Sequence, residues 1–235
     1  MKIFNTLSGC IRPIVSPACV LCSKPAGDSG LCIACLGALP RADGVRCPVC
    51  ASPMPTSTAT YCGRCIQRRP HYDYAVAALE YASPVDHLIA VLKYSRDLSA
   101  ARALGFVLAR LLEQEPYPDV VLPMPIAPIR LRERGFNQAE EIARYACAEF
   151  GISVSRGIAQ RTSAGSPQAS LPWRERAKNV RCVFTSDNEM AGKTVAVIDD
   201  VLTTGATLNE LAAVLKRAGA TSVTGWIVAR TPPHR

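Results

Sequence analysis

The alternation of apolar and polar positions from about residue 70 onward predicts strands and helices in turn. Short apolar runs predict four strands, over residues 72–82, 119–125, 193–200 and 221–230. Apolar residues at helical spacing predict four helices, over residues 84–95, 98–115, 137–151 and 207–219. Pro84, Asn137 and Gly151 suit a first turn, an N-cap and a C-terminal stop. Because the final strand, helix and strand imply a right-handed parallel unit, the order indicates an open α/β sheet.

The first part of the chain lacks these periodicities and is rich in cysteine. Nine of the 11 cysteines lie in the first 65 residues, and eight of them form CxxC pairs. We therefore expect two domains, a small cysteine module over 1–70 and an α/β domain over 71–235. A length of 235 residues is enough for both.

The CxxC pairs predict structural zinc. Two thiolates three residues apart on a tight turn can occupy adjacent corners of a tetrahedron. Sequential pairing resembles a double zinc ribbon and gives two four-cysteine sites, Cys19/Cys22/Cys32/Cys35 and Cys47/Cys50/Cys62/Cys65. The spacing leaves open a crossed pairing, or one zinc ion beside a degenerate second site. Redox chemistry is disfavoured because no thioredoxin-like βαβ pattern surrounds the pairs.

Composition and charge narrow the class of protein. Hydrophobic residues make up 49% of the chain, and no window approaches the length of apolar sequence that spans a membrane. Polar residues interrupt the apolar start, so we expect no export and a cytoplasmic location. The net charge is +8, and residues 1–70 hold eight lysines and arginines against two aspartates. This excess of positive charge is typical of a surface that binds nucleic acid, and residues 64–70 are the candidate basic patch. A solvated surface that aids solubility explains the excess equally well. Two zinc–tetrathiolate sites, each of charge −2, would also neutralise most of the positive charge of residues 1–70.

The stretch VAVIDDVLTTGATLNE, over residues 195–210, carries the clearest chemistry. A strand delivers Asp199 and Asp200 to the sheet edge where ligands bind in open α/β folds. The following loop can surround a phosphate at a helix N-terminus; its residues are Thr203, Thr204, Gly205, Ala206 and Thr207. Carboxylates beside a bound phosphate can accept hydrogen bonds from vicinal sugar hydroxyls, so a phosphorylated ribose satisfies both parts. A Walker A loop is excluded because no G-K-[ST] follows, and a solvated acid pair before a capped helix is the alternative.

This motif resembles the signature that binds phosphoribosyl pyrophosphate (PRPP) in type I phosphoribosyltransferases. With residues 122–140, residues 161–180 and the cysteine module, essentially the whole chain resembles the competence protein F (ComF/GntX) family. The resemblance implies a zinc-ribbon module before an open, mostly parallel sheet of type I phosphoribosyltransferase type. It also implies a link to natural transformation and the use of external DNA.

Basic residues flank the motif in sequence and suit the same ligand. Guanidinium groups bind phosphate oxygens as a fork, and the candidates are Arg130, Arg132, Arg134, Arg161 and Arg176. The Gly/Ser/Pro-rich segment between the last two suggests a flap that closes over pyrophosphate. The resemblance implies that residues 122–125 form the pyrophosphate loop, and Lys93 also matches the family pattern. Solvated surface positions are the alternative for these cations.

The acceptor substrate is the part that the sequence leaves unassigned. In a transferase, Mg²⁺ would bridge pyrophosphate and ribose hydroxyls while Asp199 and Asp200 hold the ribose. The resemblance implies that hypoxanthine-type enzymes carry an acid at the position of Thr203, and threonine cannot act as a general base at neutral pH. A role in purine salvage is therefore not indicated.

Three hypotheses follow from this pattern. The favoured one is a PRPP-binding protein of DNA processing that contacts single-stranded DNA and DNA-uptake proteins. The others are a metabolic phosphoribosyltransferase with an unidentified acceptor and a non-catalytic sensor of PRPP. Trp173 and Phe136 are isolated aromatic residues, so no platform for stacked bases stands out. The family resemblance adds that active transferases of this fold are often dimers.

Overall fold

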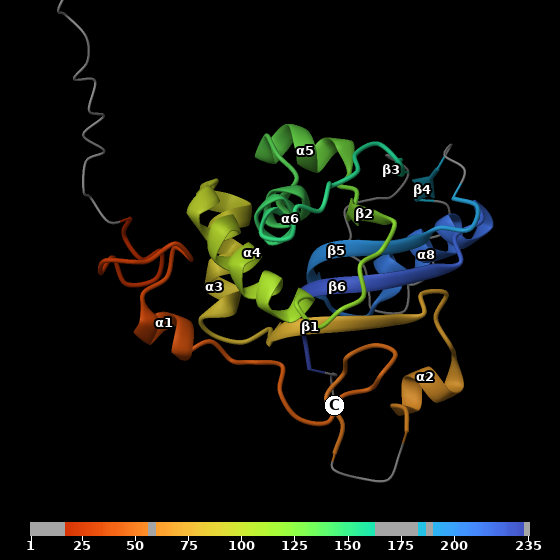
Figure 1. The fold of residues 1–235 in the computed structure, drawn as a ribbon, viewed down its shortest axis with the longest axis horizontal. Helices are drawn as coiled ribbons and strands as arrows, with labels where there is room; N and C mark the ends of the chain where they lie inside the picture. The colour runs from red at the N-terminus through yellow and green to blue at the C-terminus, as the bar shows by residue number, and fades with distance from the viewer. Residues whose placement is uncertain (1–16, 56–59, 163–182, 187–189, 233–235) are drawn as a thin grey trace, which may run out of the picture.

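The centre of the fold is a four-stranded sheet in which all strands are parallel, in the order β1-β6-β5-β2 (Figure 1). The computed structural model describes residues 17–55, 60–162, 183–186 and 190–232. The strands are β1 (Tyr74–Glu80), β2 (Val120–Pro123), β5 (Thr194–Leu202) and β6 (Ser222–Arg230). The prediction of an open parallel sheet is confirmed, and all four predicted strands are present close to their predicted bounds.

Burial explains why these strands were visible as apolar runs. Every residue of β6 after Ser222 is buried. Along β5, Val195 and Val197 join the core beneath α8, while Ala196 and Ile198 join the core beneath α4 and α6. A parallel sheet covered on both faces needs apolar side chains at nearly every position of its central strands.

Helices cover the two faces of the sheet. One face carries α3 (Val85–Ala90), α4 (Leu98–Leu112) and α6 (Gln138–Ala148), and the other carries α8 (Ala206–Arg217) (Figure 1). The helix predicted over 84–95 begins as α3 and continues as a π-helical turn, η1 (Val91–Ser95). A π-helical turn shifts the side chains that follow it relative to a regular helix, and this turn carries Lys93.

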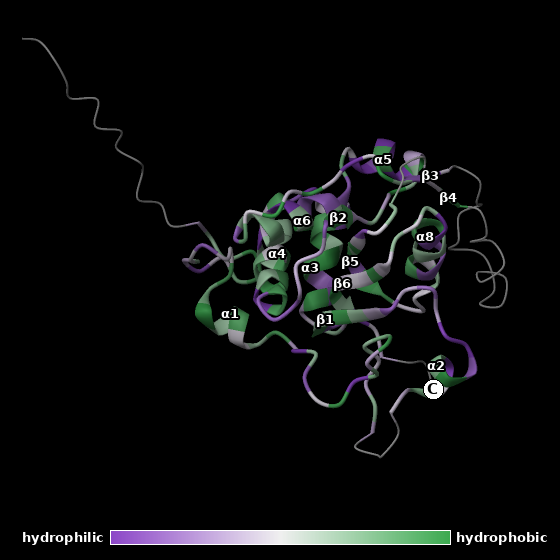
Figure 2. Cartoon of the chain, turned by 45° about the vertical axis from the view of Figure 1, so that its right-hand side comes forward, coloured by the Kyte–Doolittle hydropathy of each residue, from purple (hydrophilic) through white to green (hydrophobic). Residues whose placement is uncertain are grey.

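Shorter elements lie at the periphery. Helix α5 (Pro128–Arg134) follows β2, and β3 (Gln160–Arg161) pairs antiparallel with β4 (Phe184–Thr185). In Figure 2 hydrophobic residues concentrate in the strands and in α4, while α5 carries several hydrophilic residues. Within the described ranges, no helix is both long and apolar enough to cross a membrane.

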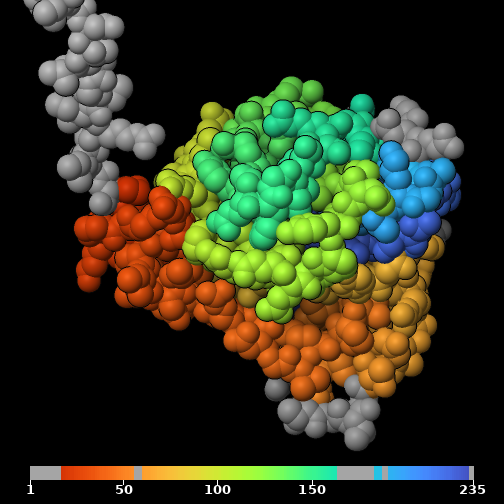
Figure 3. All heavy atoms as spheres, in the orientation of Figure 1, coloured from red at the N-terminus to blue at the C-terminus, as the bar shows by residue number. Residues whose placement is uncertain are grey.

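The cysteine-rich segment packs along the sheet. It contains the short helices α1 (Ile33–Gly37) and α2 (Gly63–Gln67). Between them the chain follows the free edge of β1, where Ala42 N donates to Ala78 O at 3.1 Å and Ala75 N donates to Val49 O at 2.9 Å. Figure 3 shows these orange residues against the lower side of the molecule. The segment therefore covers an edge strand whose backbone groups would otherwise be unpaired. The boundary between 1–70 and 71–235 stays a prediction.

Candidate functional site

Two adjacent carboxylates end the buried part of β5. Asp199 is half-buried, and Asp200 is 4% exposed. The backbone N–H of Asp200 donates to Asp199 Oδ1 at 2.9 Å. Lys93 Nζ lies 2.6 Å from Asp200 Oδ2, which accepts no well-aligned hydrogen bond from any described residue. Asp200 is thus held by an ion pair, and Asp199 is left facing the cleft.

The electrostatics of the acid pair favour a cationic or hydrogen-bond-donating ligand. Burial and the neighbouring Asp200 raise the pKa of Asp199 well above its ordinary value, although Lys93 opposes the shift. Burial lowers the pKa of Arg161, and the carboxylate of Asp199 opposes that shift. A ligand that donates hydrogen bonds or brings a metal ion would relieve the repulsion between the two carboxylates.

One cleft of about 220 Å³ brings together the acid pair, Thr207 and two of the predicted arginines. It lies at the carboxyl ends of β2 and β5, where ligands bind in open α/β sheets. Its polar lining comes from Lys93, Arg134, Gln138, Arg161, Asp199, Asp200 and Thr207. Met124, Pro125 and Ile126 supply the rest of the lining. Three cations beside two carboxylates make a site suited to an anion that also carries hydroxyl groups.

The TTGAT loop, Thr203–Thr207, joins β5 to α8 at this edge. Gly205 has φ +78° and forms the N-cap of α8, and its carbonyl accepts from Asn209 N at 2.9 Å. Thr204 Oγ1 accepts from Ala206 N at 3.2 Å, and Thr203 is exposed. The loop therefore sits at the positive end of a 12-residue helix, which favours a bound anion.

Asn137 links two segments that line the cleft, the one at Met124 and the one at Gln138. Its Oδ1 accepts from Ala139 N at 3.1 Å and caps α6, as the sequence predicted. Its Nδ2 also donates to Met124 O at 3.0 Å, while Met124 N donates to Ile198 O at 2.8 Å. One side chain thus ties the predicted pyrophosphate loop to a helix start. Sequence reasoning missed this second contact, as well as the place of Gln138 in the cleft, because both depend on tertiary packing.

The remaining predicted arginines lie elsewhere. Arg130 and Arg132 are exposed on α5 and do not line the cleft, and Arg130 Nη1 pairs with Glu133 Oε2 at 2.7 Å. Arg176 and Trp173 lie outside the described residues. Of the five arginines predicted as phosphate ligands, Arg134 and Arg161 are therefore the two that the structure brings to the acid pair.

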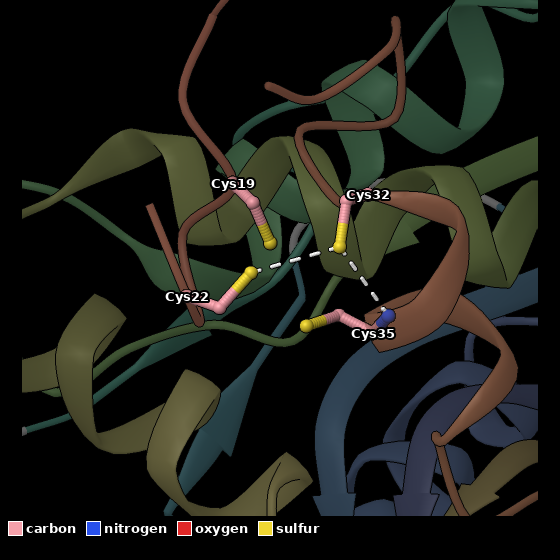
Figure 4. A group of neighbouring side chains, drawn as sticks. All are labelled: Cys19, Cys22, Cys32 and Cys35. Carbon is pink, nitrogen blue, oxygen red and sulfur yellow. Dashed lines mark hydrogen bonds between the residues drawn. The ribbon is translucent and has the colours of Figure 1, made fainter. Parts of the chain in front are cut away.

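The cysteines form two separate clusters with the sequential pairing. Within each group of four, the sulfur atoms all lie within 4.8 Å of one another. Cys22 Sγ and Cys32 Sγ are 3.6 Å apart in the first cluster (Figure 4), and Cys50 Sγ and Cys62 Sγ are 3.6 Å apart in the second. Tetrahedral zinc with bonds of about 2.3 Å places its sulfur ligands roughly 3.8 Å apart. Both donor sets fit structural zinc, so the crossed pairing and the degenerate site are excluded.

Known protein families match both the cysteine-rich part and the α/β part of the chain. A family model described as phosphoribosyl transferase domain matches residues 104–232, and one described as double zinc ribbon domain matches residues 10–66. The DNA utilization protein YhgH of Shigella flexneri is 34% identical, over 91% of this chain and 96% of that protein. Competence protein F of Haemophilus influenzae is 29% identical, over 72% of this chain and 77% of that protein.

Overlap with solved structures is weaker. A purine phosphoribosyltransferase from Pyrococcus horikoshii overlaps 67% of this chain and 87% of its own, with 16% identity and a TM-score of 0.33. The assignment therefore rests on the family models, the YhgH relative and the two cysteine clusters. The chain belongs to the competence protein F (ComF/GntX) family, with a double zinc ribbon followed by a phosphoribosyltransferase domain.

Proposed function

We propose that this protein binds PRPP with Mg²⁺ in the cleft and acts in the use of external DNA. The observation that carries the proposal is one cleft lined by the acid pair, by three cations and by Thr207, at the end of the TTGAT loop where α8 begins. PRPP contains a pentose with vicinal hydroxyls, a monophosphate and a diphosphate. Carboxylates can bind the hydroxyls, a helix N-terminus can bind the monophosphate, and cations can bind the diphosphate.

Each part of PRPP has a matching group in the cleft. The loop amides and threonine hydroxyls at the start of α8 suit the 5-phosphate. Asp199 and Asp200 can accept hydrogen bonds from the ribose hydroxyls. Arg134 and Arg161 face the region left for the diphosphate, and Lys93 can shift between Asp200 and that anion.

The donor set of the acid pair also suits Mg²⁺. Carboxylate oxygens are ligands that Mg²⁺ prefers, and it usually combines one or two of them with substrate phosphates and water. Asp199 and Asp200 are the residues that would hold it, and it would neutralise charge on the diphosphate. Thr203, with its exposed hydroxyl, supplies no general base. We therefore place PRPP binding ahead of transfer to a nucleobase.

The relatives named for competence and DNA utilization support a role with DNA. The basic patch of the sequence lies at and after α2, where Arg64, Arg68 and Arg69 are exposed. We propose single-stranded DNA as its ligand, in a two-domain cytoplasmic protein divided near residue 70. DNA affinity that falls steeply with salt, and falls further in an Arg68→Ala/Arg69→Ala variant, is the expected result.

The deciding experiment is calorimetric titration of zinc-replete protein with PRPP and Mg²⁺. Parent protein should bind, and an Asp199→Asn/Asp200→Asn variant should not. Glu113→Gln, at the C-terminal end of α4 and outside the cleft, is the control that should bind like the parent. No binding by the parent would refute the proposal. Pyrophosphate release that depends on one added base would favour the metabolic transferase, and binding without turnover would favour a sensor.

A further inference from the structure

Arg230, the last residue of β6, joins the second cysteine cluster to the TTGAT loop. The side chain is buried, with 1% of its surface exposed. Its Nε donates to Cys50 O at 2.9 Å, and its Nη1 donates to Leu202 O at 2.8 Å and to Thr203 O at 2.7 Å. In Figure 1 the chain leaves β6 and runs down beside the orange residues of that cluster. One guanidinium group therefore holds a zinc-ligand turn and the start of the loop together.

The charge of Arg230 needs a partner that the α/β domain does not supply. No carboxylate in the described part of the chain lies within ion-pair distance of it. Its acceptors are backbone carbonyls, the Thr231 hydroxyl and the hydroxyl of Ser52. Four thiolates with one Zn²⁺ carry a charge of −2, and Cys50 is one of the four. Arg64 Nη2 lies 3.9 Å from Cys50 Sγ, so two guanidinium groups flank this cluster.

Packing provides a second link between the same parts. Tyr72 is 3% exposed and belongs to the core that contains Cys47 and Cys50. Its hydroxyl lies 2.9 Å from the position a Cβ would take on Gly205, in the middle of the loop. The neighbouring His71 N donates to the side chain of Asn209 in α8 at 2.7 Å.

The first cluster makes contacts of a different kind. Arg102 Nε on α4 donates to Asp28 O at 2.6 Å, and Gly30 packs against the carbonyl of Ser99. Leu31 belongs to the core beneath α4 and α6. Among the described residues, nothing from the first cluster hydrogen-bonds to residues 202–207. The two zinc sites are thus unequal in their relation to the cleft.

We propose that the second zinc site, acting through Arg230, holds the TTGAT loop in its PRPP-binding conformation. Arg230 is a positioning residue in this proposal, which rests on the proposed function of the cleft. Loss of zinc from the second cluster frees the Cys47–Cys50 turn and leaves the buried guanidinium without its counter-charge. The carbonyls of Leu202 and Thr203 then lose their donor, and a smaller fraction of the protein holds the binding-competent loop. Loss of zinc from the first cluster leaves the loop in place.

Amide hydrogen exchange of residues 202–207 tests this directly, because it reports the loop whether or not PRPP is present. The first matched pair is Arg230→Lys and Arg102→Lys, with bound zinc measured for each. Lysine keeps the positive charge but cannot serve acceptors on both sides with a fork. The Arg230→Lys variant should keep both zinc ions, yet the amide hydrogens of residues 202–207 should exchange faster than in the parent. Its affinity for PRPP should fall about tenfold or more. Arg102→Lys should match the parent in loop exchange.

The second matched pair removes one ligand from each cluster, Cys62→Ser and Cys22→Ser. Each should lose one zinc ion, and only Cys62→Ser should deprotect the loop. If Arg230→Lys does not fold, Ser52→Ala removes one acceptor of the same guanidinium and should raise loop exchange to a smaller extent. Unchanged loop exchange in the folded Arg230 or Ser52 variant would overturn the proposal. So would equal deprotection of the loop by Cys22→Ser and Cys62→Ser. A parent that shows the expected exchange pattern but binds no PRPP would instead refute the function proposed for the cleft.

Discussion

Replacing Gly205 with alanine should strain the TTGAT loop in two separate ways. Gly205 has φ +78°, a conformation that costs a residue with a Cβ about 1–2 kcal/mol. The added Cβ would also lie 2.9 Å from the Tyr72 hydroxyl, and relieving such overpacking costs roughly 1–3 kcal/mol more. Gly205→Ala should therefore lower the free energy of unfolding by about 2–5 kcal/mol.

The chain offers controls that separate the two contributions. Gly192 has φ +74° with nothing within 4 Å of its Cβ position, so Gly192→Ala should show the backbone cost alone. Tyr72→Phe removes the hydroxyl that the new Cβ would meet. In the Tyr72→Phe background, Gly205→Ala should therefore lower the free energy of unfolding by about as much as Gly192→Ala does in the parent. Urea unfolding followed by circular dichroism measures all four variants. Equal costs for Gly205→Ala and Gly192→Ala in the parent background would show that the Tyr72 contact does not constrain the loop.

Three further predictions concern the acid pair and the helices that support it. Gly105→Ala should destabilise the protein by about 1–3 kcal/mol, because its Cβ would lie 2.6 Å from a side-chain atom of α6; Gly37→Ala, with nothing within 4 Å, is the control, and equal unfolding midpoints would refute the reasoning. Lys93→Met should cost roughly 2–4 kcal/mol by leaving Asp200 buried without its cation, and adding Asp200→Asn should recover most of that loss in urea unfolding. The raised pKa of Asp199 means that the folded protein holds this proton more tightly than the unfolded chain, so stability from this group is lost as pH rises from the ordinary aspartate range through the raised value. Asp199→Asn should therefore gain stability relative to the parent over that rise, and a pH-independent difference would contradict the shift.

Much of the fold was predictable because its signals are local. The strands of a sheet covered on both faces must be apolar throughout, and the caps of α6 and α4 use residues of the expected type. The cysteine pairing was predictable for a similar reason, since each cluster draws on neighbouring CxxC turns. The pair β3 and β4, with two residues each, is too short to produce a periodic signal.

The contacts that complete the site depend on distant parts of the chain. Lys93 reaches Asp200 from a π-helical turn, and periodicity does not distinguish such a turn from a regular helix. Arg230 ends a strand and looks like a surface residue in the sequence, yet its acceptors include a residue 180 positions earlier. Residues 40–49 cover the edge of β1 without forming a long strand of their own, so no alternation marks them.

The position of β6 in the sheet determines the order in which parts of the fold can form during synthesis. β6 lies between β1 and β5, yet it follows both along the chain. During synthesis both cysteine clusters and the other three strands of the central sheet leave the ribosome before the strand that joins β1 to the rest of that sheet. Contacts between such distant segments form slowly, because closing a long loop loses conformational entropy before the contacts can stabilise the chain. Until β6 is made, β1 has no partner strand in the sheet and Cys50 has no Arg230 to bind. Both cysteine clusters are thus available to capture zinc well before Arg230 can join the second cluster to the TTGAT loop.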